Sequence, residues 1–259
     1  MGILNVTPDS FSDGGLFFSE RTIERRGEQL IEEGADIIDI GGESTRPFAA
    51  PVSVEEELKR VIPAIKAIRR ISNIPLSIDT TKSSVAEQAL DSGADIVNDI
   101  SAMRFDPKMA ILVRNHCCPA VIMHMQGTPK DMQIKPSYTD VIAETIAFFR
   151  ERLASLGNQG VDLSQIIIDP GIGFGKSLAH NLTILNNAAA YQVLNCPVLI
   201  GHSRKSFLCS LLGQDLKDRD QPTAVIAALL AQRQVSIVRV HDVTGTKQAL
   251  QLAEGIARA

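Results

Sequence analysis

The chain alternates, eight times over, between a short apolar run and a segment with helical apolar spacing. The runs that we expect to be strands cover residues 2–6, 36–40, 76–78, 95–98, 120–124, 165–168, 197–200 and 236–240. The helical segments lie near residues 21–34, 53–71, 82–92, 107–115, 138–157, 178–190, 204–212 with 221–232, and 244–258. Strands that alternate with helices predict a parallel α/β sheet. Because eight such units in 259 residues match the size of a (β/α)8 barrel, we expect a single-domain TIM barrel over residues 1–259.

Local patterns support this interpretation without proving closure. In the second helical segment the apolar residues recur at helical intervals: Val54, Leu58, Val61, Ile62, Ile65 and Ile68. The phrases EGADII (33–38) and SGADIV (92–97) are near repeats, and each ends a helix at glycine and begins a buried strand. A doubly wound open sheet is the alternative architecture, because alternation alone does not establish closure.

Composition narrows the class of protein. The net charge of −4 offers no basic field for nucleic acid or an anionic membrane, so local groups must hold any anionic ligand. The longest apolar stretch, residues 224–231, is too short to span a bilayer, and no basic and apolar leader begins the chain. The cysteines show neither CxxC nor zinc spacing; they are Cys117, Cys118, Cys196 and Cys209. We therefore expect a cytoplasmic protein with buried, reduced thiols.

A polar side chain stands at the predicted carboxyl end of every strand. These residues are Asn5, Asp39, Asp79, Asn98, His124, Asp169, Ser203 and His241. Barrel enzymes draw their catalytic groups from such positions. For any single residue a structural role in holding loop backbone is equally good, but eight in eight units are harder to attribute to structure alone.

Two long polar loops follow the first two strands. The first loop covers residues 7–15, and its turn chemistry also suits an ordinary surface loop, although loops of this length are usually functional. Asn5, at the tip of the first strand, offers an oxygen and an amide to a hard cation or a phosphate. The second loop, residues 43–47, carries Thr45 and Arg46, which either close over a ligand or are merely exposed.

Asp169 ends an apolar run and precedes the glycine-rich segment 171–176. That segment lacks the Walker spacing and is therefore no phosphate loop. A carboxylate on the floor of a dry pocket needs donors to offset its burial. A ligand with two adjacent N–H groups would supply them, while a turn acid is the alternative interpretation.

The loops after the seventh and eighth strands indicate an anion site. In many barrels these loops bind phosphate, and here residues 201–206 carry two cations and a helix start. Arg239 and His241 alternate across one residue, so both side chains face the same side. With Asn5 they would form an anion site, although an ion pair with a neighbouring glutamate is the alternative for Arg239.

Taken together and in order, these motifs resemble the dihydropteroate synthase family of pterin-binding barrels. The matching phrases span nearly the whole chain: MGILNVTPDSFSDGG, DIIDIGGESTRP, SIDTTKSSVAEQAL, GADIVNDIS, VIMHMQGTP, IIIDPGIGFGK, SRKSF and RVHDV. The resemblance implies condensation of 6-hydroxymethyl-7,8-dihydropterin diphosphate with 4-aminobenzoate to 7,8-dihydropteroate and diphosphate. It also implies Mg2+ as cofactor, small-molecule substrates as partners, and a homodimer formed through the last helices.

The resemblance further implies roles for single residues. The pterin would be held by Asp79, Asn98, Asp169 and Lys205. The diphosphate would be held by Asn5, Thr45, Arg239 and His241, with Asn5 also a ligand of Mg2+. The 4-aminobenzoate would be held by Phe11, Thr45, Arg46, Pro47, Phe174 and Ser203. The catalytic set would be Asp79, Lys205, Arg239 and His241, with diphosphate leaving before the arylamine attacks the pterin methylene.

Two features depart from the family pattern. The chain begins at its first strand, whereas family members usually carry residues before it, so we leave open how the barrel bottom is sealed. His202 stands where we expect a small or apolar residue, and we expect its side chain to point outward rather than to disturb the aminobenzoate site.

Two other functions remain as alternatives. A barrel that moves a methyl group from methyltetrahydrofolate to a corrinoid protein would keep Asp79, Asn98 and Asp169, but it would not need the first loop or the anion site. A non-catalytic pterin-binding subunit should have lost catalytic-loop residues that this chain retains.

Overall fold

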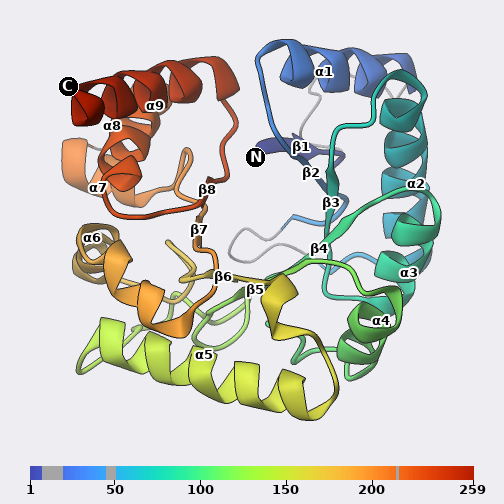
Figure 1. Cartoon of the computed structure of the whole chain (residues 1–259), viewed down its shortest axis with the longest axis horizontal. Helices are drawn as coiled ribbons and strands as arrows, with labels where there is room; N and C mark the ends of the chain where they lie inside the picture. The colour runs from blue at the N-terminus through green and yellow to red at the C-terminus, as the bar shows by residue number, and fades with distance from the viewer. Residues whose placement is uncertain (8–19, 45–50, 214–215) are drawn as a thin grey trace.

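The computed structural model describes residues 1–7, 20–44, 51–213 and 216–259. Its strands are β1 (Gly2–Asn5), β2 (Ile38–Gly41), β3 (Leu76–Asp79), β4 (Ile96–Asp99), β5 (Ala120–Met123), β6 (Ile166–Asp169), β7 (Leu199–Ile200) and β8 (Ile237–Val238). The helices are α1 (Glu20–Glu32), α2 (Val54–Ile71), α3 (Ser83–Asp91), α4 (Lys108–His116), α5 (Val141–Asn158), α6 (Leu178–Asn186), α7 (Phe207–Leu212), α8 (Asp220–Ala231) and α9 (Val243–Arg258), with short 3-10 helices η2 (Leu163–Gln165) and η3 (Ala188–Leu194). The helices form an outer ring around the strands (Figure 1). None of the described helices combines the length and apolar character needed to cross a bilayer.

The strands close into a barrel, as expected. Strands β1 to β6 pair in chain order in one parallel sheet, and β7 pairs with β8 in a second. Isolated parallel bridges join the two sheets on both sides, between Ile168 and Val198 and between Gly2 and Val240. A backbone hydrogen bond of 2.9 Å from Ile3 N to Val240 O reinforces the second junction. The open doubly wound alternative is therefore wrong, and β1 lies beside the eighth strand.

Some boundaries differ from the predictions. Helix α5 begins at Val141 because the side chain of Asp140 caps it, accepting from two backbone N–H groups of the first turn. Helix α6 ends at Asn186, and the rest of the predicted helix continues as η3. Strands β7 and β8 have two residues each, shorter than the expected runs 197–200 and 236–240. The barrel is thus least regular where the predicted anion site lies.

The repeated αβ turn forms as its sequence predicts. Gly34 and Gly93 adopt left-handed backbone conformations, with φ of +87° and +110°. The residue after each glycine then bonds back into the helix, from Ala35 N to Leu30 O at 3.0 Å in the first copy and at 2.9 Å in the second. Because left-handed φ is strained for side-chain-bearing residues, glycine is needed at both turns. These turns deliver β2 and β4 to the sheet in matching orientation.

Of three apolar clusters among the described residues, two form the layers of the barrel core. The larger cluster fills the space between the strands and the helices and includes Leu4, Ile65 and Phe149. A smaller cluster fills the barrel interior with residues from seven strands or their approaches: Met1, Ile37, Ile96, Val121, Ile167, Leu199 and Ile237. This inner layer is the apolar base below the polar carboxyl end, as expected for a filled barrel rather than a pore.

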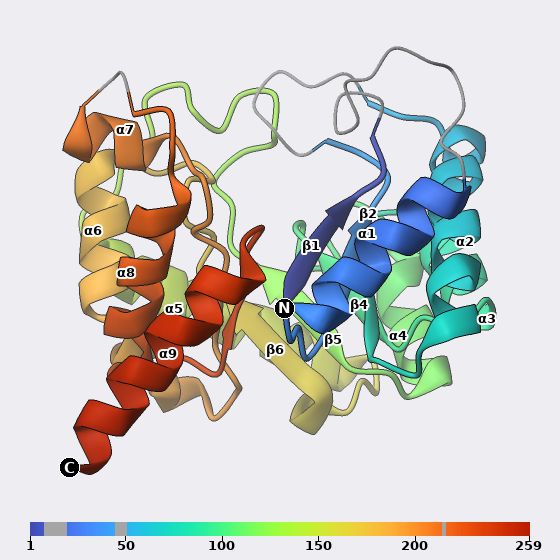
Figure 2. The same cartoon turned by 90° about the horizontal axis from the view of Figure 1, so that it is seen from above.

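The barrel bottom is covered on one side and hollow on the other. Met1 packs into the inner cluster, and its amino group donates to Val238 O at 3.0 Å. Beside it lies a cavity of about 400 Å³ between the turn after α1, strand β8 and helix α9. In the view of Figure 2, α9 runs along this flank beside the N-terminal end of β1.

The cysteine prediction is partly wrong. Cys118, Cys196 and Cys209 are buried, whereas Cys117 is exposed. Cys117 is the residue that ends α4, and its left-handed backbone (φ 48°) places it outside the helix packing. All of these cysteines are free thiols, and burial raises the pKa of the Cys118 thiol to about 11.

Candidate active site at the carboxyl ends of the strands

Strand register places three predicted site residues in one layer at the carboxyl end. Asn5 pairs with Gly41, Gly41 with Asp79, and Asp79 with Asn98. Gly41 lacks a side chain between its neighbours: a Cβ there would stand 3.7 Å from both Asn5 Oδ1 and Asp79 Oδ2. The amide oxygen and the carboxylate therefore face the same small space. Asp39 lies two residues deeper in β2, below this layer.

Not every predicted residue is described by the structure. Those that it places are Asn5, Asp79, Asn98, Asp169, Phe174, Ser203, Lys205, Arg239 and His241. Those that fall outside the described residues are Phe11, Thr45, Arg46 and Pro47. The pterin and diphosphate predictions, apart from Thr45, can thus be compared with geometry, whereas most of the predicted aminobenzoate set cannot.

Arg239 crosses the barrel to two carboxylates. Its Nε donates to Asp39 Oδ2 at 2.6 Å, and its NH2 group donates to Asp79 Oδ2 at 2.8 Å. Asp39 is fully buried, and Asn98 Nδ2 lies 3.3 Å from both of its oxygens. The ion pair that the sequence left as an alternative for Arg239 is therefore present, with two aspartates rather than one neighbouring acid. Any anion bound here must share this arginine.

The charges in this cluster strongly influence one another. Burial raises the pKa of the Asp79 carboxyl, Arg239 acts against that rise, and the nearby Asp39 carboxylate adds to it. Burial acts to lower the pKa of Arg239, but Asp39 and Asp79 outweigh it and raise that pKa above its ordinary value. The arginine is thus a permanent cation whose charge is already balanced by protein groups.

Asp169 forms the floor of the site and is separated from Arg239 only by Gly201, where a Cβ would stand 3.9 Å from Arg239 Cβ. It ends β6, is 7% exposed, and accepts a hydrogen bond of 2.8 Å at Oδ1 from Gly171 N. Its Oδ2 faces Gly201, where a Cβ would stand 3.7 Å away, so glycine leaves room beside the carboxylate. Burial raises the pKa of Asp169, while Lys205 and the Gly171 N–H act to lower it. The carboxylate is a buried acceptor with capacity for further donors.

Lys205 reaches the floor from the loop after β7. Its Nζ donates to Ile172 O and lies 4.5 Å from the centroid of the Phe174 ring. Gly173 makes this approach possible, because a Cβ there would stand 3.1 Å from Lys205 Cδ and its φ is +80°. Burial lowers the pKa of Lys205 to about 8, although Asp169 opposes that shift. Lys205, Phe174 and Asp169 therefore form one compact group.

Ser203 and His241 lie together beside the arginine. Ser203 Oγ is 3.0 Å from His241 Nδ1, and it also accepts from His241 N at 3.2 Å. His202, the unexpected residue before Ser203, turns away from the site as predicted, toward α8, where Nε2 lies 2.9 Å from Thr223 O. It is nevertheless fully buried, and burial lowers its pKa to about 4, so it is neutral at pH 7 and donates from Nε2.

The protein oxygens at the carboxyl end of the barrel are too few to hold a hard cation alone. They suit such a cation only if a bound ligand supplies further oxygen atoms. Among the described residues, no group of three or more His, Cys, Asp or Glu side chains is arranged to hold a metal ion. Asn5 Oδ1 does face the open space above Gly41, next to Asp79 Oδ2. Mg2+ commonly takes one or two protein oxygens and completes its shell with phosphate oxygens and water. Asn5 thus fits an ion that arrives with a diphosphate.

Sequence reasoning missed two features of the site. It gave Asp39 a place at a strand tip but no role, although an acid inside the apolar run DIIDIGG signals a buried partner. It also missed Lys176, which is 3% exposed and contacts His124 Nδ1 at 3.0 Å. Only its place directly after the glycine-rich segment could have singled out Lys176.

Comparisons with known proteins agree with this geometry. The family model described as pterin binding enzyme matches residues 1–241. A dihydropteroate synthase from Synechocystis is 45% identical over all of this chain and 90% of that protein. The solved Yersinia pestis dihydropteroate synthase, in a sulfonamide drug complex, superposes with a TM-score of 0.94 at 38% identity and covers 100% of this chain and 94% of that one. The Xanthomonas albilineans dihydropteroate synthase with 4-aminobenzoic acid gives a TM-score of 0.93 at 43% identity, covering 100% of this chain and 92% of that one.

Proposed function

The chain belongs to the pterin-binding enzymes and, among them, to the dihydropteroate synthases, and we propose how its own residues perform that reaction. It is a transferase that condenses 6-hydroxymethyl-7,8-dihydropterin diphosphate with 4-aminobenzoate in folate biosynthesis. The observation that carries the assignment of roles is that a buried carboxylate floor at Asp169 and the guanidinium of Arg239 lie in the same barrel mouth, on either side of Gly201.

The pterin ring binds on the Asp169 side. Asp169 accepts hydrogen bonds from the 2-amino group and the adjacent ring N–H, a charge-assisted pair that offsets the burial of the carboxylate. Asn98 supplies an amide to the same heterocycle, and its own amide nitrogen is oriented by Asp39. Lys205 lies over Phe174 between the pterin floor and the place we assign to 4-aminobenzoate.

The diphosphate binds on the Arg239 side. Arg239 and His241 stabilise the negative charge that grows on the leaving group, and Asn5 contributes its amide oxygen. A Mg2+ ion held by Asn5 and the diphosphate would supply further charge stabilisation. Arg239 uses two of its five N–H groups on Asp39 and Asp79, and we propose that diphosphate takes over the N–H group on Asp79 when it binds.

Release of diphosphate leaves a pterin methylene cation, which the arylamine attacks. Asp79 lies beside the departing group and, once Arg239 turns toward diphosphate, offers a carboxylate that stabilises positive charge. The neutral arylamine is itself a nucleophile, so the step needs no strong general base. The aminobenzoate pocket that we propose contains Phe174 and Ser203, together with four residues outside the described part of the chain: Phe11, Thr45, Arg46 and Pro47.

Direct measurement of diphosphate release tests this function. The protein is incubated with the pterin diphosphate and Mg2+, with and without 4-aminobenzoate, and both diphosphate and dihydropteroate are quantified. We expect equal amounts of the two products. A non-catalytic pterin-binding subunit would release neither, and a methyltransferase barrel would release no diphosphate while accepting methyltetrahydrofolate.

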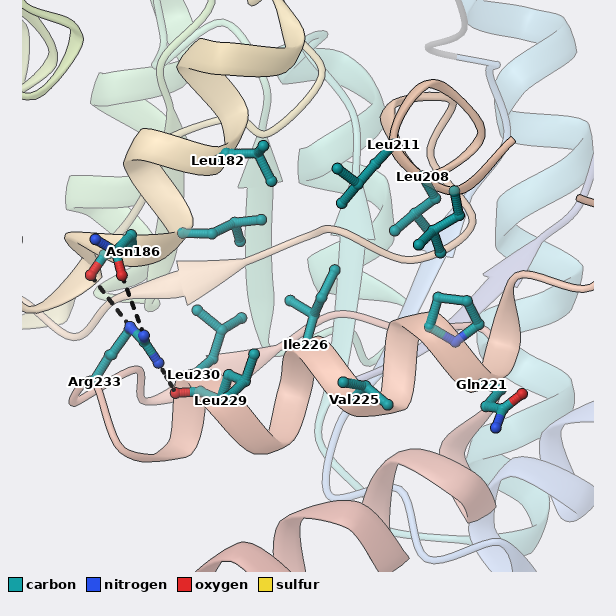
Figure 3. Close-up of a pocket in the computed structure, with 13 residues that line it drawn as sticks. Leu182, Asn186, Leu208, Leu211, Gln221, Val225, Ile226, Leu229, Leu230 and Arg233 are labelled. Carbon is teal, nitrogen blue, oxygen red and sulfur yellow. Dashed lines mark hydrogen bonds between the residues drawn. The ribbon is translucent and has the colours of Figure 1, made fainter. Parts of the chain in front are cut away.

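We also propose that the enzyme is a homodimer, assembled through an apolar groove between α6, α7 and α8. The groove has a volume of about 480 Å³, and Figure 3 shows leucine and valine side chains from the three helices facing it. Leu211, Leu212, Val225 and Leu229 are each about half exposed. A contiguous apolar surface of this kind is typical of a protein interface, and a second copy presents the same surface.

Sedimentation equilibrium tests the dimer. Val225→Glu places a charge in the groove and should shift the protein to monomers. Ile256→Glu on α9 is the matched control, because Ile256 is 73% exposed and lies outside the groove. A dimer that survives Val225→Glu and is lost with Ile256→Glu would place the interface on α9 instead.

The free cysteines agree with the cytoplasmic location that we propose.

A further inference from the structure

Lys176 is a buried lysine with an unusual set of acceptors. Its side chain is 3% exposed. Nζ donates to Phe174 O at 3.0 Å, lies 3.0 Å from His124 Nδ1, and is 3.4 Å from His124 O. Three acceptors therefore surround the three N–H groups of one ammonium, and none of them is a carboxylate.

This geometry fixes the proton position on His124. Because the ammonium has only donors, Nδ1 of His124 must accept, and the ring proton must lie on Nε2. Burial lowers the pKa of His124 strongly, and the nearby Lys176 and Arg104 add to that shift, so the ring is neutral. His124 N also donates to Asp169 O at 2.9 Å, which ties this pair to the strand that carries the floor carboxylate.

The lysine belongs to a set of side chains that hold the loop after β6. Four successive carbonyl groups of this loop, at residues 172–175, each accept a hydrogen bond from a side chain: Lys205, Gln133, Lys176 and Tyr138, in that order. Of these four donors only Lys176 is buried. It is therefore the donor that solvent competes with least, and its bond to Phe174 O fixes the residue whose ring lies against Lys205.

We propose that Lys176, seated on His124, is a positioning residue for the pterin and aminobenzoate sites. It fixes the loop that presents Phe174 and the Ile172 carbonyl to Lys205. It also holds a positive charge near Asp169, and that charge favours the carboxylate form that accepts hydrogen bonds from the pterin. The proposal rests on the function proposed above, since it concerns how this floor binds a pterin.

A purely structural role does not explain the choice of lysine. Burying an ammonium without a paired carboxylate is unfavourable, and an apolar side chain of similar length would fill the same space. Replacement by methionine removes that penalty but leaves three buried acceptors without their donor, so the two effects on stability oppose each other. We therefore expect Lys176→Met to change the free energy of unfolding little at pH 7 while it weakens substrate binding.

The first test compares wild type and Lys176→Met by calorimetry with free 6-hydroxymethylpterin, and by steady-state kinetics. We expect about tenfold weaker pterin binding and a loss of about 10–10² in kcat/KM, as a displaced site group produces. The wild type must bind the pterin for the comparison to apply: if it does not, the proposed function fails. If it binds and Lys176→Met binds equally well, only the present inference fails.

The pH dependence of pterin affinity shows whether Lys176 acts through its positive charge or only through the packing of its side chain. Burial lowers the pKa of Lys176 to about 7, so wild-type affinity should fall as pH rises through that value and the positive charge behind Asp169 is lost. Other charged or titratable groups near Lys176 are His124, Asp169, Lys205 and Tyr138. Lys205 contributes its own step at about pH 8, which Lys176→Met should retain. A variant profile identical to that of wild type overturns the proposal.

A second pair of variants, at His124, tests the proposal even if Lys176→Met folds poorly. Asparagine at position 124 places an amide oxygen near the site of Nδ1 and preserves an acceptor, whereas leucine removes it. We expect His124→Asn to bind pterin nearly as well as wild type, and His124→Leu to show the weakened binding of Lys176→Met. Equal affinities for His124→Asn and His124→Leu would show that the acceptor is irrelevant and would contradict the proposal.

Discussion

The two ends of the site differ in whether protein groups already neutralise their charged side chains. At the floor, the Asp169 carboxylate receives one backbone hydrogen bond, and its cationic neighbour Lys205 donates elsewhere, to Ile172 O. At the anion end, Arg239 is already bound by Asp39 and Asp79. The floor is therefore prepared for a ligand that brings donors, whereas the charge of the anion end is already neutralised by protein groups, and we expect Arg239 to change partners when diphosphate arrives.

The backbone shows the same contrast. Asp169 ends a four-residue strand in the continuous ladder from β1 to β6, with its loop held by side chains on four carbonyls. Arg239 and His241 follow the two-residue β8, which pairs with the equally short β7. Single backbone hydrogen bonds, from Arg239 N to Ile200 O and from Val240 N to Met1 O, hold the anion end, and the side-chain bonds of Arg239 add to them.

The largest effect should come from Arg239→Met. This change leaves Asp39 and Asp79 buried without their cation, so the free energy of unfolding should fall by about 3–5 kcal/mol, and turnover should drop by about 10²–10³. Urea unfolding and diphosphate release measure the two effects.

Arg204→Met is the control for this prediction. Arg204 also pairs with an aspartate, Asp220, but its side chain is 47% exposed, so its loss should cost less than about 1 kcal/mol. Equal destabilisation by the two arginine variants would show that the cluster at Arg239 stabilises the fold no more than an exposed ion pair does.

Asp169→Asn should come next. Losing the carboxylate charge should weaken pterin binding by about 1.5–3 kcal/mol, the range for hydrogen bonds to charged groups, while the fold persists. Calorimetry with the free pterin measures it. Asp162→Asn is the control, because Asp162 caps the exposed helix η2 far from the floor residues. Unchanged pterin affinity in Asp169→Asn would remove this residue from the site.

Asp39→Asn should have a smaller effect of opposite sign on the anion end. With one competing carboxylate gone, Arg239 is freer to bind diphosphate, and affinity for inorganic diphosphate should rise by roughly fivefold to tenfold, about 1 kcal/mol. Competition between diphosphate and the pterin diphosphate substrate gives this affinity. Weaker diphosphate binding would mean that Asp39 holds Arg239 in its productive place rather than competing for it.

The last effect concerns Lys205 and the pH dependence of folding stability. Its pKa is lowered to about 8 in the folded protein, against an ordinary value of 10.5. Between these values the unfolded chain binds more protons than the folded one, so folding stability should rise with pH relative to Lys205→Met. Thermal unfolding at pH 7, 8, 9 and 10 checks the sign. A stability that falls across this window relative to Lys205→Met would contradict the lowered pKa of Lys205.

The sequence predicted those features that depend on residues close together in the chain. Apolar β-branched runs predicted all eight strands, and Gly34 and Gly93 predicted two turns, because strand burial and left-handed backbone leave local signals. The partners of Arg239 left no such signal, since Asp39 and Asp79 lie 200 and 160 residues away in sequence. The same holds for Lys176 and His124, which are 52 residues apart. Barrel closure brings Arg239 to the two aspartates, and the pairing of β5 with β6 brings Lys176 to His124, so neither contact could be read before the structure.

The most direct test of the contrast between the two ends is a crystal structure with diphosphate bound, compared with one without it. The account predicts that Arg239 gives up its bond to Asp79 and contacts the diphosphate, while Gly171 N stays on Asp169 and Lys176 stays on His124. A complex in which Arg239 keeps both aspartates, or in which the Asp169 loop moves instead, would contradict it.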